Sequence, residues 1–130
     1  MKRIAAIGAL LLFWVPALMA AEVMASGGFT KLVPGTDKRV AAENVTLADK
    51  IYFQILVVAD DGDHSLQVNI YEGEGREVYN SESTLTARGG QAGVAVSYSF
   101  NAARDAPGLW WYVAAVDGKV VLSKSLEVYR

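Results

Sequence analysis

The strongest structural signal in the chain lies in residues 107–121, whose sequence is PGLWWYVAAVDGKVV. There, Asp117-Gly118 separates two apolar runs, residues 109–116 and 119–128. An Asp-Gly pair in this position favours a two-residue type I′ turn, because both central residues of that turn need positive φ. The sequence therefore predicts that a tight antiparallel hairpin closes the chain.

Upstream of this hairpin, apolar and polar residues alternate in short segments that are separated by Gly, Asp and Asn. The alternation is clearest in residues 51–59, 66–71 and 94–101, and it is typical of strands with one buried face. Shorter strand segments are expected at residues 29–33, 38–42 and 76–80, the last followed by a polar connection through Gly89-Gly90. About seven closely spaced strands with no helical period predict an all-β antiparallel sandwich.

Several features of the last third of the chain occur together. They are Tyr98-Ser-Phe-Asn, the Pro-Gly-x-aromatic opening of residues 107–113, and an Asp-Gly-Lys turn before a strand that ends in Leu126-Glu127-Val128. In these features the chain resembles exported bacterial immunoglobulin-like or fibronectin type III-like domains of uncharacterised families. The resemblance implies an immunoglobulin-like β-sandwich and no particular activity. The chain departs from antibody-type domains because it lacks their paired Cys and has Tyr71 or Val68 where their core Trp is expected.

The N-terminus has the pattern of a secretory signal peptide. Two basic residues precede an apolar run over residues 4–15, and Pro16 and small residues follow where a signal peptidase would cut. Pro16 ends the apolar helix and leaves an extended stretch for the protease. Cleavage is expected after Ala20 or Ala21.

The predicted organisation is a signal peptide at residues 1–20, a flexible lead-in at residues 21–28 and a β-sandwich domain at residues 29–130. The alternative is a retained membrane anchor, but a spanning helix needs roughly 20 apolar residues. The apolar run is shorter than that, and no Cys follows it to carry a lipid. We therefore expect a periplasmic or secreted protein that meets the membrane only through its signal peptide before cleavage.

The composition narrows the classes of function. The chain has 12 basic and 14 acidic residues, and loss of the signal peptide would leave 10 against 14, a net charge of about −4. No basic cluster remains to follow a phosphate backbone, so nucleic acid is not an expected partner. The chain has no Cys, so a hydrophobic core without disulfides must hold the domain together.

Catalytic and metal-binding chemistry finds little support in the sequence. A nucleophile needs a base within hydrogen-bond reach, but the chain has no Cys, and its only His is His64, inside the acidic turn of residues 60–64. Asp60, Asp61 and Asp63 could offer oxygen ligands to Ca²⁺, but the closing Glu of an EF-hand loop is missing, and copper or zinc needs several His or Cys ligands. We therefore expect no catalytic residue, no metal and no cofactor, and a solvated turn at His64.

Four acidic residues, Glu72, Glu74, Glu77 and Glu82, lie close together in the sequence. Paired carboxylates can hydrolyse glycosides when they face each other across a cleft. Because these four lie in or beside a turn, the simpler interpretation is a solvated edge that discourages aggregation between strands.

The pair Trp110-Trp111 is the most informative feature for binding. Adjacent strand residues point to opposite faces, so Trp110 is expected in the core and Trp111 on the outer face. If this strand pairs with residues 66–71, the predicted partner-binding face consists of Trp111, Val113, Tyr71 and Asn69. Trp and Tyr suit such a face because they supply large, rigid contact area. The alternative is that Trp111 is covered by the N-terminal segment or by its own neighbours.

These observations predict a non-enzymatic exported binding or accessory module of the cell envelope, with another envelope protein or a glycan as its partner. A structural or assembly subunit that pairs through an edge strand is the main alternative. A metal carrier or a periplasmic hydrolase would need His64 in a pocket with two carboxylates.

Overall fold

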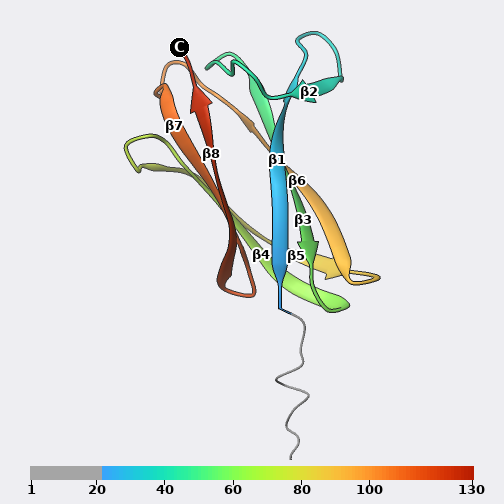
Figure 1. Cartoon of the computed structure of the whole chain (residues 1–130). Helices are drawn as coiled ribbons and strands as arrows, with labels where there is room; N and C mark the ends of the chain where they lie inside the picture. Colours follow the sequence, from blue (N-terminus) through green and yellow to red (C-terminus); the bar gives the residue numbers. More distant parts are fainter. Residues whose placement is uncertain (1–21) are drawn as a thin grey trace, which may run out of the picture.

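The computed structural model describes residues 22–130, which form eight strands in two antiparallel sheets of four strands each (Figure 1). The first sheet has the order β2-β1-β3-β6 and the second has the order β5-β4-β7-β8. The strands are β1 (Met24–Leu32), β2 (Arg39–Ala41), β3 (Lys50–Val58), β4 (Gly62–Tyr71), β5 (Glu77–Ala87), β6 (Gln91–Ser99), β7 (Gly108–Val116) and β8 (Lys119–Val128).

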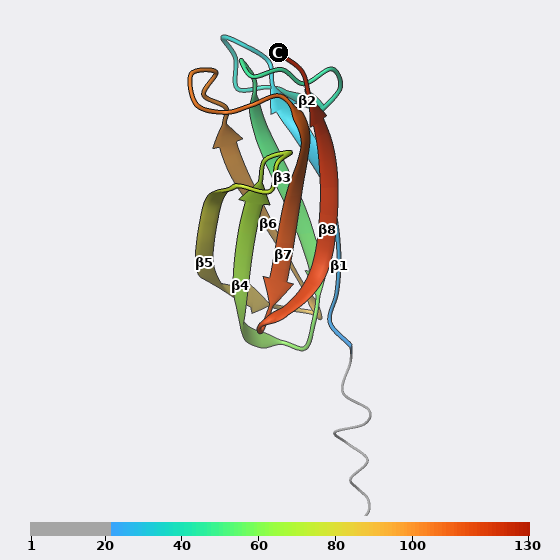
Figure 2. The same cartoon turned by 90° about the vertical axis from the view of Figure 1, so that its left-hand side faces the viewer.

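The two sheets face each other across one core, which makes the chain an immunoglobulin-like β-sandwich of eight strands rather than about seven (Figure 2). The predicted all-β fold class is confirmed. The predicted signal peptide, at residues 1–20, lies outside the described residues. Within residues 22–130, no helix is long and apolar enough to cross a membrane.

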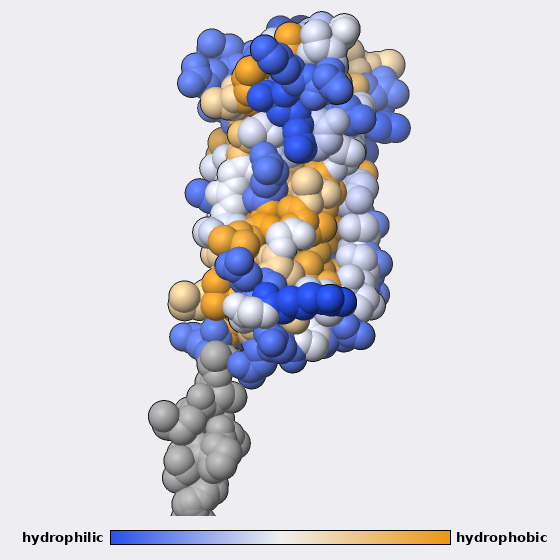
Figure 3. Space-filling model, turned by 90° about the vertical axis from the view of Figure 1, so that its right-hand side faces the viewer, coloured by the Kyte–Doolittle hydropathy of each residue, from blue (hydrophilic) through white to orange (hydrophobic). Residues whose placement is uncertain are grey.

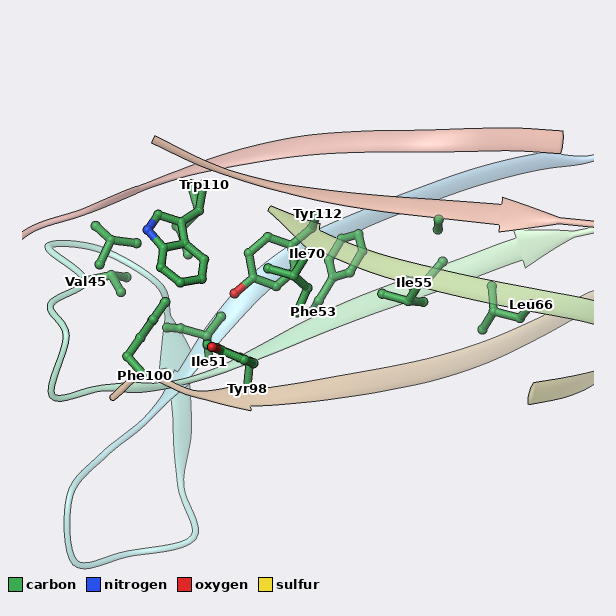
Figure 4. Packing of buried hydrophobic residues seen from close by; sticks show 14 of the residues in the cluster. Val45, Ile51, Phe53, Ile55, Leu66, Ile70, Tyr98, Phe100, Trp110 and Tyr112 are labelled. Atoms are coloured by element: carbon green, nitrogen blue, oxygen red, sulfur yellow. The ribbon is translucent and has the colours of Figure 1, made fainter. Parts of the chain in front are cut away.

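The core is built from the alternating positions of the central strands, as the sequence predicts (Figure 4). Ile51, Phe53 and Val57 of β3 are buried, and so are Trp110 and Tyr112 of β7. Aromatic rings meet across the two sheets: the Phe53 and Tyr112 ring centroids are 5.3 Å apart in an edge-on arrangement. Such pairs add to the free energy gained from burying apolar area, so they link the two sheets directly.

The closing hairpin has the predicted turn. Asp117 has φ 51° and Gly118 has φ 82°, the positive values that a type I′ turn requires. Asp at the first position tolerates this left-handed conformation better than most residues do.

The expected flexible lead-in at residues 21–28 is wrong for Met24–Gly28, which form the first half of β1. They pair with Gln54–Val58 of β3 in an unbroken antiparallel register. Gly27 and Gly28 interrupt the apolar alternation by which a strand is recognised in the sequence. The structure nevertheless requires a glycine at position 27. A Cβ at Gly27 would stand 2.5 Å from the carbonyl oxygen of Gln54 and 2.9 Å from the side chain of Leu122.

The predicted short segment at residues 76–80 and the polar connection after it are also wrong, because β5 continues to Ala87. Among residues 81–87 of this edge strand only Leu85 and Ala87 are buried, so apolar alternation is nearly absent. Similarly, β4 begins at Gly62 rather than at Leu66. In both cases pairing with a neighbouring strand, rather than apolar alternation, creates the strand.

Candidate binding groove

The structure brings the four residues of the predicted partner-binding face together on the outer side of the second sheet. In the antiparallel pair of β4 and β7, Tyr71 lies opposite Trp111 and Asn69 lies opposite Val113. The side chain of Trp111 is 42% exposed, whereas the other three are half-buried. Among residues 22–130, no segment covers Trp111 enough to bury it.

Three of these residues, Tyr71, Trp111 and Val113, form one side of a groove of about 520 Å³. The other side is the β4–β5 connection, which Figure 2 shows beside β7. The groove is lined by Tyr71, Glu72, Gly73, Glu74, Gly75, Trp111, Val113 and Ser123. Asn69 does not line it. Sequence reasoning did not assign the connection to the site, although its position directly after Tyr71 is a signal that could have placed it there.

The connection is held in place by an ion pair at its two ends. The Arg76 guanidinium donates to both carboxylate oxygens of Glu72, at 3.0 and 2.9 Å. The Gly75 N–H donates to the Glu72 carbonyl oxygen at 2.8 Å, and Gly75 has φ 89°. At Gly73 the chain runs so close to β7 that a Cβ would stand 3.1 Å from the Leu109 carbonyl oxygen. The groove wall is therefore packed against β7 rather than free to swing away.

A buried carboxylate continues this network beneath the groove wall. Asp105 is 4% exposed and accepts hydrogen bonds from the Tyr98 hydroxyl at 3.0 Å and from the Asn101 N–H at 2.9 Å. Arg76 lies 3.8 Å from Asp105 and also donates to the Arg104 carbonyl oxygen at 3.3 Å. Arg76 thus ties the β4–β5 connection to the β6–β7 connection.

Glu72 and Arg76 each stabilise the charged form of the other. The hydrogen bonds from Arg76 lower the pKa of Glu72 below its ordinary value, and the hydrogen bond to Glu72 raises the pKa of Arg76. Burial is the main cause that raises the pKa of Tyr98. Glu72 therefore stays ionised but is neutralised locally by Arg76.

The remaining carboxylates make the rest of this face acidic. Asn69 Nδ2 donates to Glu77 at 3.2 Å, and the Ser65 hydroxyl donates to Glu82 at 3.4 Å. Within the described part of the chain, Glu74, Glu77 and Glu82 form no ion pair. Their negative charge is left for a ligand or for solvent. The four glutamates of the predicted acidic cluster are thus distributed along a loop and an edge strand.

The predicted solvated turn at His64 is wrong, because His64 lies in β4 with both ring nitrogens engaged. Nδ1 donates to Asp117 at 2.7 Å and Nε2 donates to the Asp60 carbonyl oxygen at 2.6 Å. Only the charged imidazolium has an N–H on both ring nitrogens, so His64 is protonated when it donates both bonds. The hydrogen bond to Asp117 is the main cause that raises the pKa of His64. His64 therefore joins the β3–β4 turn to the closing hairpin.

Asp61 and Asp63, in and beside that turn, also accept hydrogen bonds from other segments of the chain. Asp61 accepts from the Gly90 N–H at 2.7 Å, and Asp63 accepts from the Thr86 hydroxyl at 2.7 Å. Over residues 22–130, no group of three or more His, Cys, Asp or Glu side chains is arranged to hold a metal ion. The turn connects strands at this end of the sandwich.

A second hollow, of about 640 Å³, lies on the opposite sheet and was not foreseen. Its lining residues are Ser26, Gly27, Gly28, Gln54, Ile55, Leu56, Gly93, Val94 and Ala95. Figure 3 looks onto this side and shows a hydrophobic area over the middle of the sheet. Leu56 is 43% exposed and Val58 is 40% exposed. The hollow is open because small residues of β1 and β6 flank the larger ones of β3.

Fold and groove together define an immunoglobulin-like domain with an aromatic groove that has carboxylates along its wall. The sequence matches no family model and no curated protein. Among solved structures, an alkylpurine DNA glycosylase from Pseudomonas fluorescens bound to DNA is similar over 88% of this chain and 32% of its own, with 16% identity and a TM-score of 0.56. A β-glucosidase from Listeria innocua is similar over 84% of this chain and 16% of its own, with 15% identity and a TM-score of 0.53.

An immunoglobulin-like protein from Pseudomonas aeruginosa is similar over 85% of this chain and 98% of its own, with 16% identity and a TM-score of 0.47. The chain spans about a third or less of the two enzymes that it resembles. At such identities the likeness to these enzymes shows the fold alone.

Proposed function

We propose that the chain is a non-enzymatic, exported binding module whose groove beside Trp111 takes a basic segment of another envelope protein. The observation that carries this proposal is the exposed Trp111 ring, set opposite Tyr71 in a groove with carboxylates along its wall. Large aromatic side chains concentrate binding energy in protein interfaces, and Arg and Lys stack on their faces. An acidic face would also speed the approach of a basic partner.

A protein partner fits this groove better than a neutral glycan does because of charge. Glu74 lines the groove, and Glu77 and Glu82 lie on the neighbouring β5; none of the three has a cation partner among the described residues, so the negative charge of this face favours a ligand with Lys or Arg. A neutral sugar would stack on Trp111 but would leave those charges unchanged. Glycan binding is therefore an outcome that the test must be able to reveal.

The test follows the Trp111 indole N–H signal by NMR during titration with a short arginine-containing peptide and, separately, with a chitooligosaccharide. We expect the peptide to shift this signal and the buried Trp110 signal to move little. Trp111→Ala should abolish peptide binding, and Glu74→Gln should weaken it. Leu56→Ala is the matched control, because Leu56 is 43% exposed but lies on the opposite sheet and does not line the groove.

Two results would overturn the proposal. No shift of the Trp111 signal with either probe would remove the groove as a binding site. A shift with the chitooligosaccharide alone would replace the protein partner with a glycan.

Export is tested separately, by expressing the whole chain in a Gram-negative host and sequencing the N-terminus of the periplasmic product. A mature protein that starts at Ala21 or Glu22 is expected. An uncleaved chain in the membrane fraction would instead support the retained anchor.

A further inference from the structure

The four edge strands of the sandwich differ in how they are protected against pairing with another strand. Natural proteins protect edges by keeping them short, by placing charges on them or by bulges. β2 has three residues and carries Arg39. β5 carries Glu77 and Glu82, and β8 carries Lys119, Lys124 and Glu127 and has an irregular register with β7.

β6 has none of these protections. Its sequence, QAGVAVSYS, has no charged residue and no Pro, and its register with β3 is unbroken over nine residues. It lies at the edge of its sheet, on the far side from β1 (Figure 1). A regular, uncharged edge of this length is a ready template for a further strand.

The direction of the β6 backbone groups follows from the bonds at its two ends. The Ala59 N–H donates to the Gly90 carbonyl oxygen at 3.1 Å, and the Phe100 N–H donates to the Asp49 carbonyl oxygen at 3.4 Å. Hydrogen-bonded pairs alternate in an antiparallel ladder. Val94 and the other even-numbered residues of β6 therefore direct their backbone groups toward β3.

The odd-numbered residues direct their N–H and C=O groups away from the sheet. Gln91 bonds with Arg88 at 2.9 and 3.4 Å. For Gly93, Ala95, Ser97 and Ser99, no partner for the outward groups occurs within residues 22–130. These four residues form an unpaired backbone ladder.

The side chains of β6 also suit an added strand. Val94 and Val96 face the core but are only partly buried, whereas their β3 partners Ile55 and Phe53 are 3% and 0% exposed. A further strand would cover these two valines. On the outer face, Gly93 has no local reason to be glycine: its φ is not positive, and the nearest atom to an added Cβ is 3.9 Å away. Glycine inside a strand often marks a close approach of another backbone.

We propose that β6 pairs antiparallel with β6 of a second copy of this chain, so that one sheet runs across both molecules. A two-fold axis places the same strand of the two copies side by side. A charged residue on that strand would therefore lie close to a residue of the same charge on the second copy. β6 carries no charge and is therefore compatible with self-pairing. Self-pairing of β5 would bring Glu77 and Glu82 of two copies together, and pairing of β8 would do the same with its lysines.

One register satisfies the whole ladder. It sets Gly93 opposite Ser99 of the second copy and Ala95 opposite Ser97, so every outward N–H and C=O finds a partner. Val96 then lies on the two-fold axis and faces Val96 of the second copy. Val94 lies opposite Tyr98 of the second copy, which places apolar groups together on the core side and small groups on the outer side.

The register predicts a specific cross-link. Val96 of one copy and Val96 of the second copy would form a non-hydrogen-bonded pair. Their Cα atoms would be about 4.5 Å apart, within the range that a disulfide spans. Because the chain has no Cys, Val96→Cys in the signal-free protein, residues 22–130, introduces the only thiol. Mild oxidation should convert this variant to a covalent dimer.

The matched control is Val94→Cys, the same change two residues away on the same face of the same strand. In the proposed register the two copies of residue 94 lie four residues apart along the sheet, about 13 Å at 3.3 Å per residue, so they cannot join. Cross-linking of both variants at equal rates, or of Val94→Cys alone, would overturn the proposal.

Sedimentation of the unmodified protein provides a second measurement that does not depend on these variants. Twice the monomer mass is expected at high concentration, and Ala95→Lys should return the protein to one monomer mass while circular dichroism keeps its β signal. Thr84→Lys, on the exposed edge of β5, should leave the dimer intact. A monomer throughout the concentration series, or a dimer that Ala95→Lys does not affect, contradicts self-pairing through β6.

Discussion

Trp110 and Trp111 are neighbours in β7 but lie on opposite sides of the sheet: Trp110 is 0% exposed and Trp111 is 42% exposed. The Trp110 indole N–H donates to the Ala106 carbonyl oxygen at 2.8 Å, and its ring centroid lies 4.9 Å from that of Phe100. The Trp111 ring lies beside the groove wall. One of the two rings therefore belongs to the core and the other to the candidate binding groove.

This difference predicts that the same substitution affects stability strongly at one position and little at the other. Trp110→Ala should lower the free energy of unfolding by about 3–5 kcal/mol, because it opens a cavity among Phe100, Tyr98 and the strands around them. Trp111→Ala should change it by less than about 1 kcal/mol. Urea unfolding followed by circular dichroism measures both values. Similar losses for the two variants would mean that Trp111 is part of the core.

Gly27 and Gly28 allow a similar comparison in β1. Gly27→Ala should destabilise the domain by about 1–3 kcal/mol, because the new Cβ would collide with the Gln54 carbonyl oxygen. Gly28→Ala should be neutral or stabilising by up to about 1 kcal/mol, because no atom lies within 4 Å of its added Cβ and the alanine restricts the unfolded chain.

Thermal unfolding of the two glycine variants provides the measurement. Equal tolerance of both substitutions would show that the segment before Phe29 is not held in β1. That segment would then be the flexible lead-in that the sequence predicted.

The His64–Asp117 pair predicts how stability depends on pH. The pKa of His64 is raised above its ordinary 6.5, so its contribution is complete below about pH 6.5 and is lost as the pH rises through the folded value. The pKa of Asp117 is lowered below 3.8, so its contribution is present above that value and is lost as the pH falls through the folded value.

The melting temperature should therefore fall on the alkaline side of pH 6.5, and His64→Gln should flatten that part of the profile. Asp117→Asn should flatten it too, since the imidazolium would lose its main partner. A wild-type melting temperature that rises between pH 6.5 and 8 would contradict the charged pair.

Arg76 should control the order of the groove wall. Arg76→Ala leaves Glu72 without its cation, so the β4–β5 connection should loosen and the Gly75 amide should exchange faster with solvent. Hydrogen exchange followed by NMR measures this, with the Tyr112 amide in the core as internal reference. Arg39→Ala is the matched control, because Arg39 lies over the Tyr52 ring on the other sheet. Unchanged exchange at Gly75 would show that the ion pair does not hold the wall.

The sequence was most informative where apolar alternation is strong. β3, β6 and the closing hairpin could be predicted because each core position recurs every second residue and because Asp117-Gly118 suits one turn type. The opposite facing of Trp110 and Trp111, and the alignment of Tyr71 with Trp111, followed from the same period. These features depend on residues that are close in the chain.

Only the tertiary structure decided the features that depend on distant neighbours. β1 and most of β5 are strands because β3 and β4 pair with them, although their own residues show little alternation. The groove wall is fixed by contact with Leu109, and His64 finds its carboxylate 53 residues away at Asp117. Edge strands and ion pairs between distant residues leave no periodic signal in the sequence, because their partners are set by the order of strands in the sheets.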